Sequence, residues 1–391
     1  MWPLIMNTSN PAILTSSQNY QAKELSLRDF DFDLPQEQIA QTPCSERSSS
    51  RLLVKEHNGP LLHHYVTDLP KLLPANSLLI FNDTQVFPSR LIGQLQTGGK
   101  VELFLLYSPL HAKGSLITAI GKPFKKLKEE TKIYFEDGLT ACIKFRDSTS
   151  AYPTLKLQFN LEASDLIAWT IRNGYVPLPP YIKRKEALPA KESEDLIRYQ
   201  TVYAKTLGSV AAPTAGLHFT PELFGELHSA DIDTANITLH VGAGTFMPIK
   251  TENIDAHVMH TEQYSIPSST WKKIAEAKKN GRNIIPVGTT SLRCLESFNK
   301  LLLEGNQADE LVDRWHETKL FIRPKNSTDR FHSTLVNGLM TNFHQPSSTL
   351  FMLICALIGF DEAKEMYRCA VKNNYRFYSY GDSNLLWLNK I

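Results

Sequence analysis

An abrupt change of texture between about residues 88 and 160 restricts the fold more than any other feature. Short strand-like segments follow one another here, separated by turn residues: RLIGQL, KVELFLLY, GSLITAIG, TKIYFEDGLTACIKF and TLKLQFN. Several short strands at close spacing, with a hairpin signal at FEDGL, are typical of a small β-barrel. Because the flanking sequence mixes helix and strand patterns, we predict that the barrel is inserted into a larger domain.

The larger domain is predicted to comprise residues 25–87 and 161–391 and to be α/β, with a mixed α+β arrangement. Its clearest strands are NITLHVGAGTF and RNIIPVGTT, and its clearest helix is WKKIAEAKKNG, which Gly281 ends. Strand and helix alternate only in places, so a mixed sheet is expected. Residues 1–24 are rich in Ser, Asn and Gln and are predicted to be a flexible tail.

Composition places the chain among ordinary soluble proteins, with 42% hydrophobic and 21% charged residues in 391. The longest apolar run, Leu350 to Phe360, is too short to span a bilayer. The N-terminus lacks the pattern of a signal peptide. We therefore expect no membrane association.

The five cysteines are odd in number and widely spaced, with no C-x-x-C pair. This pattern disfavours a disulfide framework or a cysteine metal site and predicts a reducing, cytoplasmic location. The net charge is only +2. Contact with a nucleic acid would therefore depend on local basic patches.

The segment VAAPTAGLHFT combines small residues with a histidine, as a loop that closely approaches a ligand requires. Thr214 and Gly216 are candidate ligand-binding residues, and His218 is a candidate proton carrier. A tight turn with a hydrogen-bonded structural histidine explains the segment equally well.

The segment LHVGAGTF supplies a second glycine pair, Gly242 and Gly244, directly after a strand. A dinucleotide-binding fold is disfavoured because the third glycine is missing and Pro248 stands where a helix should begin. A β-bulge or hairpin is the alternative. His240 alternates with Leu239 along the strand and is predicted to face away from the apolar side.

Two further polar clusters follow in the sequence. HVMHTE places His257 and His260 near Glu262, a cluster suited to hydrogen bonding or acid–base work; without a third ligand, no metal is expected. VGTTSLR predicts a helix that begins near Ser291, where backbone N–H groups could hold a carboxylate or phosphate. The residues singled out there are Thr289, Thr290, Ser291 and Arg293. Ordinary helix capping is the alternative.

Near the C-terminus, YRFYSYGDSNLL interleaves tyrosines with a basic residue, a composition suited to stacking on bases. Half-buried strand aromatics would give the same pattern. The basic stretches GKPFKKLK and IKRKE could meet phosphates, although solvated surface is the more common explanation.

Taken together and in order, several motifs resemble the S-adenosylmethionine:tRNA ribosyltransferase-isomerase family. They are ERSSSRLL, FNDTQVFPSRL, GGKVELFLL, PLPPYI, YQTVYAK, VAAPTAGLHF, TLHVGAGTF, HVMHTE, VGTTSLR, TNFHQPSSTL and YRFYSYGD. The resemblance runs from about Leu27 to about Leu386. It departs from the family pattern at Gln85, where Arg is common, and at Ile322 to Ser327, which replaces a Tyr-Pro-Gly turn.

The resemblance implies a large α/β domain with an inserted barrel, and it implies a reaction. The ribosyl part of S-adenosylmethionine is transferred to 7-aminomethyl-7-deazaguanine at the wobble position of tRNA. The reaction yields epoxyqueuosine-tRNA and releases adenine and methionine. S-adenosylmethionine is then a co-substrate, no prosthetic group is expected, and the RNA partner is the anticodon stem-loop. A monomer is expected.

Under this interpretation the sulfonium acidifies the ribose C5′, so a base must remove a proton and an acid must assist the departure of adenine. His218 and His240 are the first candidates for these transfers, followed by Glu262 and Asp382. The candidates for holding S-adenosylmethionine are Thr214, Gly216, Gly242, Gly244, Thr289, Thr290, Ser291 and Arg293. The candidates for contacting RNA are Arg47, Arg51, Tyr378 and Tyr380.

Two alternatives from other classes remain at this point. An S-adenosylmethionine-dependent RNA methyltransferase would usually show a strand followed by a glycine-rich loop and a helix near the start of its catalytic domain, and none is evident. A non-catalytic RNA-binding protein would explain the aromatic and basic residues. It would not require histidines beside glycine loops.

Overall fold

The computed structural model describes most of the chain. The described residues are 24–57, 59–106, 108–111, 116–148, 153–184, 189, 192–242, 244, 249 and 251–388. The tail predicted at residues 1–24 lies outside them except for Glu24, which forms an isolated bridge with Asn326. Within these residues, no helix is both long and apolar enough to cross a membrane.

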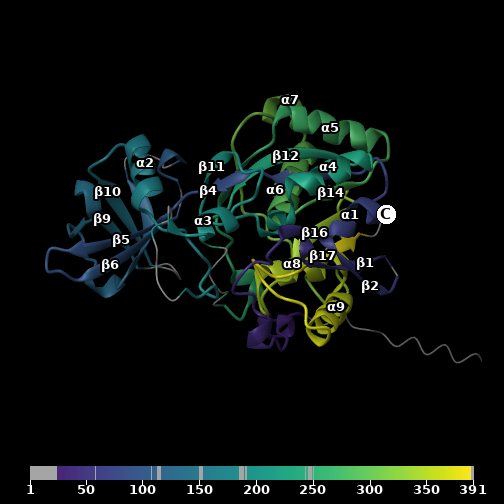
Figure 1. Cartoon of the computed structure of the whole chain (residues 1–391), viewed down its shortest axis with the longest axis horizontal. Coiled ribbons are helices and arrows are strands. Elements are labelled where there is room, and N and C mark those ends of the chain that lie inside the picture. The colour runs from purple at the N-terminus through teal and green to yellow at the C-terminus, as the bar shows by residue number, and fades with distance from the viewer. Residues whose placement is uncertain are drawn as a thin grey trace, which may run out of the picture.

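The inserted segment forms a closed barrel with the strand order β10-β7-β6-β5-β8-β9, as its texture predicts (Figure 1). Every pair of neighbouring strands is antiparallel. Alternate side chains point inward, so that Val101, Leu103 and Leu105 of one strand are fully buried. The strands are β5 (Arg90–Leu95), β6 (Lys100–Leu105), β7 (Ile117–Lys122), β8 (Lys132–Tyr134), β9 (Thr140–Asp147) and β10 (Thr154–Phe159).

One helix beyond residue 160 belongs to the barrel core. Helix α2 (Ala163–Asn173) contributes Leu166, Ile167 and Trp169 to the same apolar cluster as the barrel strands. The indole N–H of Trp169 donates to the Glu136 carbonyl at 3.1 Å. The helix therefore packs on the barrel rather than on the sheets of the large domain.

The large domain contains a five-stranded mixed sheet with the order β14-β3-β12-β13-β15. Its first three strands run parallel and the last two are antiparallel, which agrees with the predicted mixed sheet. The strands are β3 (Leu78–Asn82), β12 (Asp233–His240), β13 (Glu262–Ser265), β14 (Ile284–Pro286) and β15 (His316–Thr318). The associated helices are α4 (Pro221–Ser229), α5 (Ser268–Lys279), α6 (Thr289–Leu303) and α7 (Ala308–Leu311).

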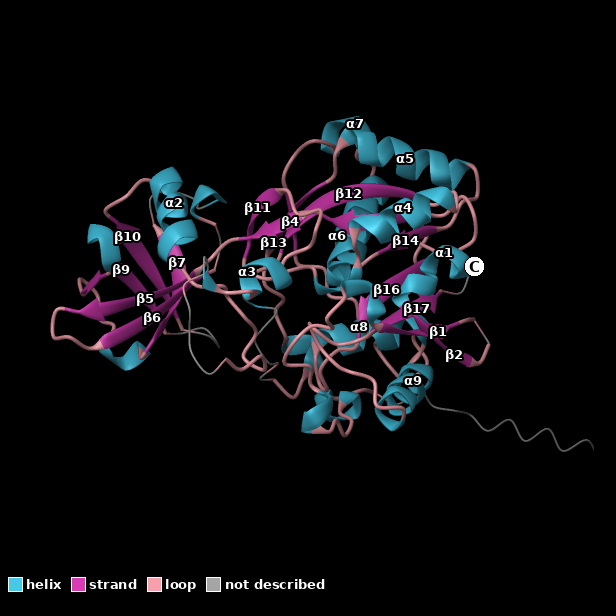
Figure 2. Cartoon of the chain, viewed as in Figure 1, coloured by secondary structure: helices cyan, strands magenta, loops and turns pink. Residues whose placement is uncertain are grey.

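A second sheet joins the two ends of the chain, with the order β16-β17-β1-β2 (Figure 2). Strand β1 runs parallel to β17, so residues more than 300 positions apart lie side by side. The strands are β1 (Arg51–Lys55), β2 (Leu61–Tyr65), β16 (Gly338–Asn342) and β17 (Ser383–Trp387). The remaining helices are α1 (Leu69–Leu72), α3 (Asp195–Arg198), α8 (Thr349–Ile358) and α9 (Phe360–Lys372).

A short parallel pair, β4 (Thr84–Val86) and β11 (Thr206–Ser209), lies where the chain leaves the large domain for the barrel and where it returns. Helix α8 corresponds to the long apolar run and is almost completely buried. Its two ends are set by Ser348, which caps its first turn, and by Gly359, whose φ of 99° favours glycine. This fold brings the helix start beside the end of β16.

Candidate functional site

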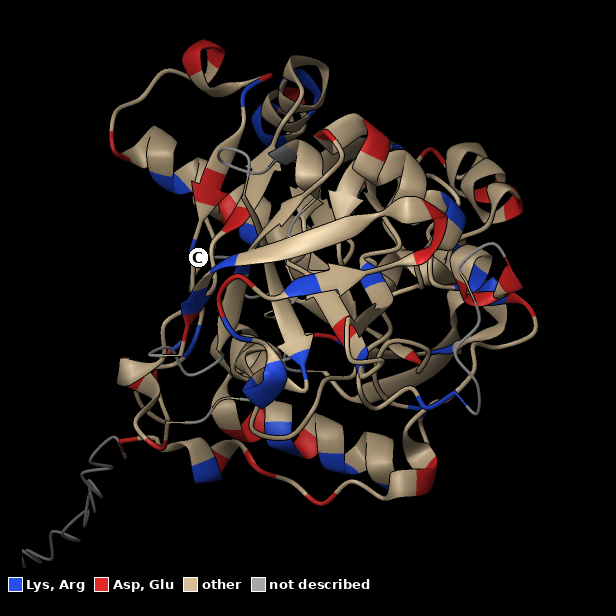
Figure 3. Cartoon of the chain, turned by 90° about the vertical axis from the view of Figure 1, so that its left-hand side faces the viewer, with Lys and Arg blue, Asp and Glu red and all other residues tan. Residues whose placement is uncertain are grey.

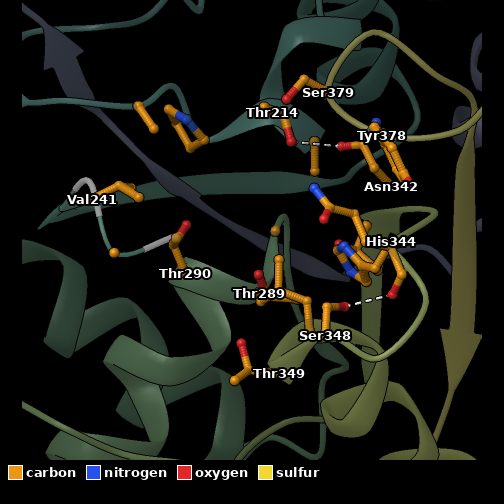
Figure 4. Close-up of a pocket in the computed structure, with 18 of the residues that line it drawn as sticks. Thr214, Val241, Thr289, Thr290, Asn342, His344, Ser348, Thr349, Tyr378 and Ser379 are labelled. Carbon is orange, nitrogen blue, oxygen red and sulfur yellow. Dashed lines mark hydrogen bonds between the residues drawn. The ribbon is translucent and has the colours of Figure 1, made fainter. Parts of the chain in front are cut away.

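A cavity of about 230 Å³ lies in the large domain where the two sheets and two helix N-termini meet (Figure 4). Segments that are distant in sequence supply its wall. They include residues 211–215, 257, 259–260, 262, 288–290, 293, 341–342, 344–350 and 378–379. Nine of the residues singled out from the sequence line it: Thr214, Gly244, His257, His260, Glu262, Thr289, Thr290, Arg293 and Tyr378.

The start of α6 faces this cavity, as the sequence predicts. Gly288 precedes the helix with a φ of 91°, a conformation that favours glycine, and Thr289 and Thr290 line the cavity. The first N–H groups of a helix carry partial positive charge and suit an anionic ligand. Ser291 differs from its neighbours because it is fully buried and its hydroxyl donates to the Val287 carbonyl at 2.8 Å.

The start of α8 also opens onto the cavity, and the sequence reasoning did not single it out. Ser348 and Thr349 line the wall, and the Ser348 hydroxyl accepts the Phe351 N–H at 3.1 Å. A signal was present, because Ser and Thr directly before an apolar run are typical of a helix N-terminus. Two helix N-termini thus converge on one cavity.

Arg293 and Glu262 form a buried ion pair in the wall, with side chains only 7% and 5% exposed. Nη1 of Arg293 donates to Oε2 of Glu262, and Nε donates to the Leu320 carbonyl at 3.0 Å. The other Glu262 oxygen accepts the Gly242 N–H at 3.2 Å. Nη2 of Arg293 is buried and has no hydrogen-bond partner among the residues the structure describes. The sequence suggested separate roles for these two residues, but the structure couples them.

His218 lies behind the cavity wall rather than in it. It ends the short 3-10 helix η9 (Thr214–His218) and is 4% exposed. Its Nδ1 is 3.0 Å from the Ser50 hydroxyl, and its Nε2 is 3.1 Å from the Asn342 amide nitrogen. Burial, assisted by the charge of Arg47, lowers the pKa of His218 to about 4, so the ring is neutral at pH 7.

His240 faces the opposite side of its strand from Val241, which lines the cavity. Its Nδ1 is 2.7 Å from the Thr84 hydroxyl, and its ring stacks on Trp315 with a centroid separation of 4.8 Å. A Cβ at Gly208 would lie 2.6 Å from the His240 ring. His240 is therefore held in a tight packing site outside the cavity.

The glycines predicted near the ligand serve different purposes. A Cβ at Gly216 would lie 1.9 Å from the Tyr203 hydroxyl, and a Cβ at Gly244 would lie 2.2 Å from the His260 ring. Gly242 would place a Cβ in open space. Of the three, only Gly244 lines the cavity. Close packing against side chains explains Gly216.

Asp382 and the two arginines predicted to contact RNA, Arg47 and Arg51, form hydrogen bonds with other parts of the chain. Asp382 is 2% exposed and accepts the backbone N–H groups of Arg51 at 3.0 Å and Arg376 at 2.8 Å. The Arg51 guanidinium also pairs with Asp382. Arg47 donates to the carbonyls of Leu217 at 3.1 Å and Ile197 at 2.6 Å. None of Arg47, Arg51 and Asp382 lines the cavity.

Aromatic rings form one side of the cavity. The rings of Tyr181 and Tyr378 lie 4.5 Å apart, and the Tyr181 hydroxyl is 2.7 Å from that of Ser379. Burial raises the pKa of both tyrosines to about 12. Tyr380 is packed behind this wall, where its hydroxyl donates to Asp195 at 3.0 Å. The two predicted stacking tyrosines thus lie in different environments.

Three histidines line the cavity: His257, His260 and His344. His344 was not identified from sequence. Its Nε2 is 3.3 Å from the Thr341 hydroxyl, and burial lowers its pKa to about 3. Among the residues the structure describes, no group of three or more His, Cys, Asp or Glu side chains is arranged to hold a metal ion.

The site thus defines a class of protein: an α/β protein with an inserted closed barrel and a polar cavity suited to a ligand that carries an anionic group. Comparison with known proteins makes this specific. A family model described as "Queuosine biosynthesis protein" matches residues 27–386, and the chain belongs to this family.

Two relatives with the same printed name illustrate the similarity. The S-adenosylmethionine:tRNA ribosyltransferase-isomerase of Phenylobacterium zucineum is 43% identical over 376 residues, covering 93% of this chain and 99% of the relative. That of Thermosipho melanesiensis is 40% identical over 366 residues, covering 93% and 100%. A crystal structure of S-adenosylmethionine tRNA ribosyltransferase from Thermotoga maritima is 30% identical, covers 92% of this chain and 99% of that chain, and has a TM-score of 0.49.

Proposed function

We propose that the chain is an S-adenosylmethionine:tRNA ribosyltransferase-isomerase. It transfers and isomerises the ribosyl part of S-adenosylmethionine onto 7-aminomethyl-7-deazaguanine at the wobble position of tRNA. The products are epoxyqueuosine-tRNA, adenine and methionine. Membership of the queuosine biosynthesis family over residues 27–386, with relatives that match almost end to end, is the observation that carries this proposal. S-adenosylmethionine is a co-substrate, and no prosthetic group is required.

The cavity suits the methionine end of S-adenosylmethionine. We place the carboxylate at the start of α6, near Thr289 and Thr290, where the backbone N–H groups of the first turn are available. Arg293 adds a buried positive charge whose Nη2 has no partner within the described part of the chain. Gly244 and Thr214 line the same cavity, and Gly242 donates its N–H to Glu262, the partner of Arg293.

Proton transfer requires at least one base and one acid. Of the four proposed carriers, only Glu262 lines the cavity, and it is paired with Arg293. His218 and His240 are each separated from the cavity by one neighbouring residue or strand face. Both remain in the proposal as residues that act indirectly, through the residue that separates each of them from the cavity, and neither contacts the substrate itself. His344 joins them as a neutral imidazole that lines the cavity.

The barrel supports the proposed binding of a tRNA anticodon stem-loop. Residues 88–160 hold eleven Lys and Arg but six Asp and Glu, a net charge of +5, whereas the whole chain carries only +2. In Figure 3, which turns the barrel side of the chain toward the viewer, ribbon positions of basic residues are interspersed with those of acidic residues. Such a local excess of positive charge attracts a phosphate backbone.

Tyr378, with Tyr181, is placed to stack on an extruded base. We further propose that the enzyme acts as a cytoplasmic monomer.

The direct test is to mix the protein with S-adenosylmethionine and a substrate tRNA and to analyse the products by mass spectrometry. Free adenine, methionine and a correspondingly heavier wobble nucleoside support the proposal. Adenosylhomocysteine would indicate a methyltransferase instead, and unchanged substrates with retained RNA binding would indicate a non-catalytic binder.

Replacing Arg293 by lysine should weaken S-adenosylmethionine binding by roughly tenfold or more while leaving tRNA binding within about twofold. An ammonium cannot reproduce the planar fork of the guanidinium, which here serves Glu262 and the ligand together. Isothermal titration with each substrate measures both affinities. Equal affinity for S-adenosylmethionine in the two proteins would remove Arg293 from the proposed site.

Affinity for tRNA should fall with added salt, and the double substitution Lys122→Gln/Lys156→Gln should flatten this dependence. Both side chains are exposed on outward-facing barrel positions. Each lost phosphate contact should reduce the slope of log affinity against log salt by about 0.7–0.9. The matched control is Lys278→Gln/Lys279→Gln, which removes the same charge at the exposed end of α5. Identical slopes in both double variants would contradict a role for the barrel face.

A further inference from the structure

Asn342, the last residue of β16, stands between the cavity and the buried ring of His218. Its amide nitrogen donates to Nε2 of His218 at 3.1 Å, and its amide oxygen accepts the Thr214 hydroxyl proton at 3.0 Å. Asn342 and Thr214 both line the cavity, and Figure 4 shows the hydrogen bond between their neighbouring side chains as a dashed line. Asn342 therefore connects the cavity to a histidine that does not itself reach it.

The surroundings of His218 fix which way the Asn342 amide points. The Ser50 hydroxyl donates to the Arg47 carbonyl at 3.4 Å, so its oxygen accepts the proton of Nδ1 in the neutral ring. Nε2 is then an acceptor and requires the NH2 side of the amide. Burial, with the nearby charges of Arg47 and Arg376, lowers the pKa of His218 to about 4 and keeps the ring neutral. The reversed amide would direct two acceptor atoms at each other.

This orientation determines what the wall offers a ligand. The second N–H of Asn342 is directed to the Asp382 carbonyl at a long 3.5 Å, so the amide nitrogen is already committed. The Thr214 proton is committed to Asn342 as well. The hydrogen-bonding sites still free for a ligand are one lone pair on the Asn342 amide oxygen and the lone pairs on the Thr214 oxygen. All of these are acceptors. The wall is therefore suited to a ligand N–H group.

We propose that Asn342 contacts substrate by accepting a hydrogen bond from an amino or ammonium group, and that His218 is a positioning residue that holds the Asn342 amide in the required orientation. This inference rests on the proposed function, in which both substrates carry such groups. S-adenosylmethionine has an α-ammonium and an adenine amino group, and the target base has an aminomethyl group. Removing Asn342 should reveal which substrate it contacts.

Single-turnover adenine release and equilibrium binding of each substrate test the proposal with three variants. Asn342→Ala and His218→Leu should each weaken the use of the same single substrate by roughly 10- to 100-fold, because a desolvated hydrogen-bonding group loses its partner. His218→Gln should stay within about threefold of wild type, because its amide oxygen can still accept from Asn342. The control His316→Leu alters a half-buried histidine outside the cavity and should leave both substrates unaffected.

The pattern among the variants separates the outcomes. If His218→Gln is impaired as severely as His218→Leu, His218 carries a proton itself and the positioning role is wrong. If Asn342→Ala binds and uses both substrates normally, the contact is wrong. If thermal melting shows that His218→Leu does not fold, Asn342→Ala still tests the contact with substrate and His218→Gln still tests the positioning role. If the wild type releases no adenine, the proposed function fails, and titration of Asn342→Ala with each substrate still tests the contact.

Discussion

Replacing Glu262 by alanine is expected to destabilise the folded protein by about 3–5 kcal/mol, the usual cost of removing one partner of a buried ion pair. Arg293 would then remain buried with its charge uncompensated, since the two side chains are 7% and 5% exposed. Denaturant unfolding followed by circular dichroism measures the loss. The same substitution also removes the acceptor of the Gly242 N–H, so the segment after β12 loses this hydrogen bond.

The double variant Glu262→Ala/Arg293→Met is the matched control for this prediction. It removes both charges and should recover much of the lost stability, because no unpaired ion remains buried. Its affinity for S-adenosylmethionine should nevertheless stay low, since the guanidinium is absent. If the single and double variants are equally unstable, electrostatic compensation is not what the pair contributes, and packing of the two side chains is the cause instead.

The architecture followed from the sequence because local patterns determine it. Alternating apolar residues and turn signals are a property of each barrel strand by itself, so residues 88–160 could be recognised as a unit. The position of α2 could not be predicted in this way. The sequence of an amphipathic helix after residue 160 does not show which of the two domains its apolar face packs against. Its buried face joins the barrel through Trp169.

The candidate site was only partly predictable for the same physical reason. Thr289 and Thr290 were identified because the start of a helix can be recognised from neighbouring residues alone. Thr214 was identified because a loop of small residues can be recognised in the same way. The role of Asn342 depends on the position of His218, which lies 124 residues away in the chain and contacts it only when η9 packs beside β16. Local sequence also could not show that Arg47 donates to the backbone carbonyls of Leu217 and Ile197, because both lie at least 150 positions away in the chain.

Acidification should destabilise the folded protein progressively below pH 6.5 because two buried histidines stay neutral in it. Burial lowers the pKa of His218 to about 4 and of His344 to about 3, whereas both titrate near 6.5 when unfolded. Between pH 6.5 and about 4 the unfolded chain therefore binds two more protons, and the free energy of unfolding falls by up to roughly 1.4 kcal/mol per pH unit for each histidine. Above pH 6.5 neither group contributes to the pH dependence.

Unfolding by urea between pH 7 and 5 measures this slope before most carboxylates begin to titrate. The double variant His218→Gln/His344→Gln should have a slope lower by up to roughly 2.7 kcal/mol per pH unit, because it removes both linked protons. The control His228→Gln changes an exposed histidine at the end of α4 and should keep the wild-type slope. If the double variant retains the full slope, then the two buried rings are not the groups that oppose protonation. If the slope decreases by only about half of the expected amount, one of the two buried histidines is held neutral and the other is not. The single variants His218→Gln and His344→Gln then show whether the neutral ring is His218, which supports Asn342.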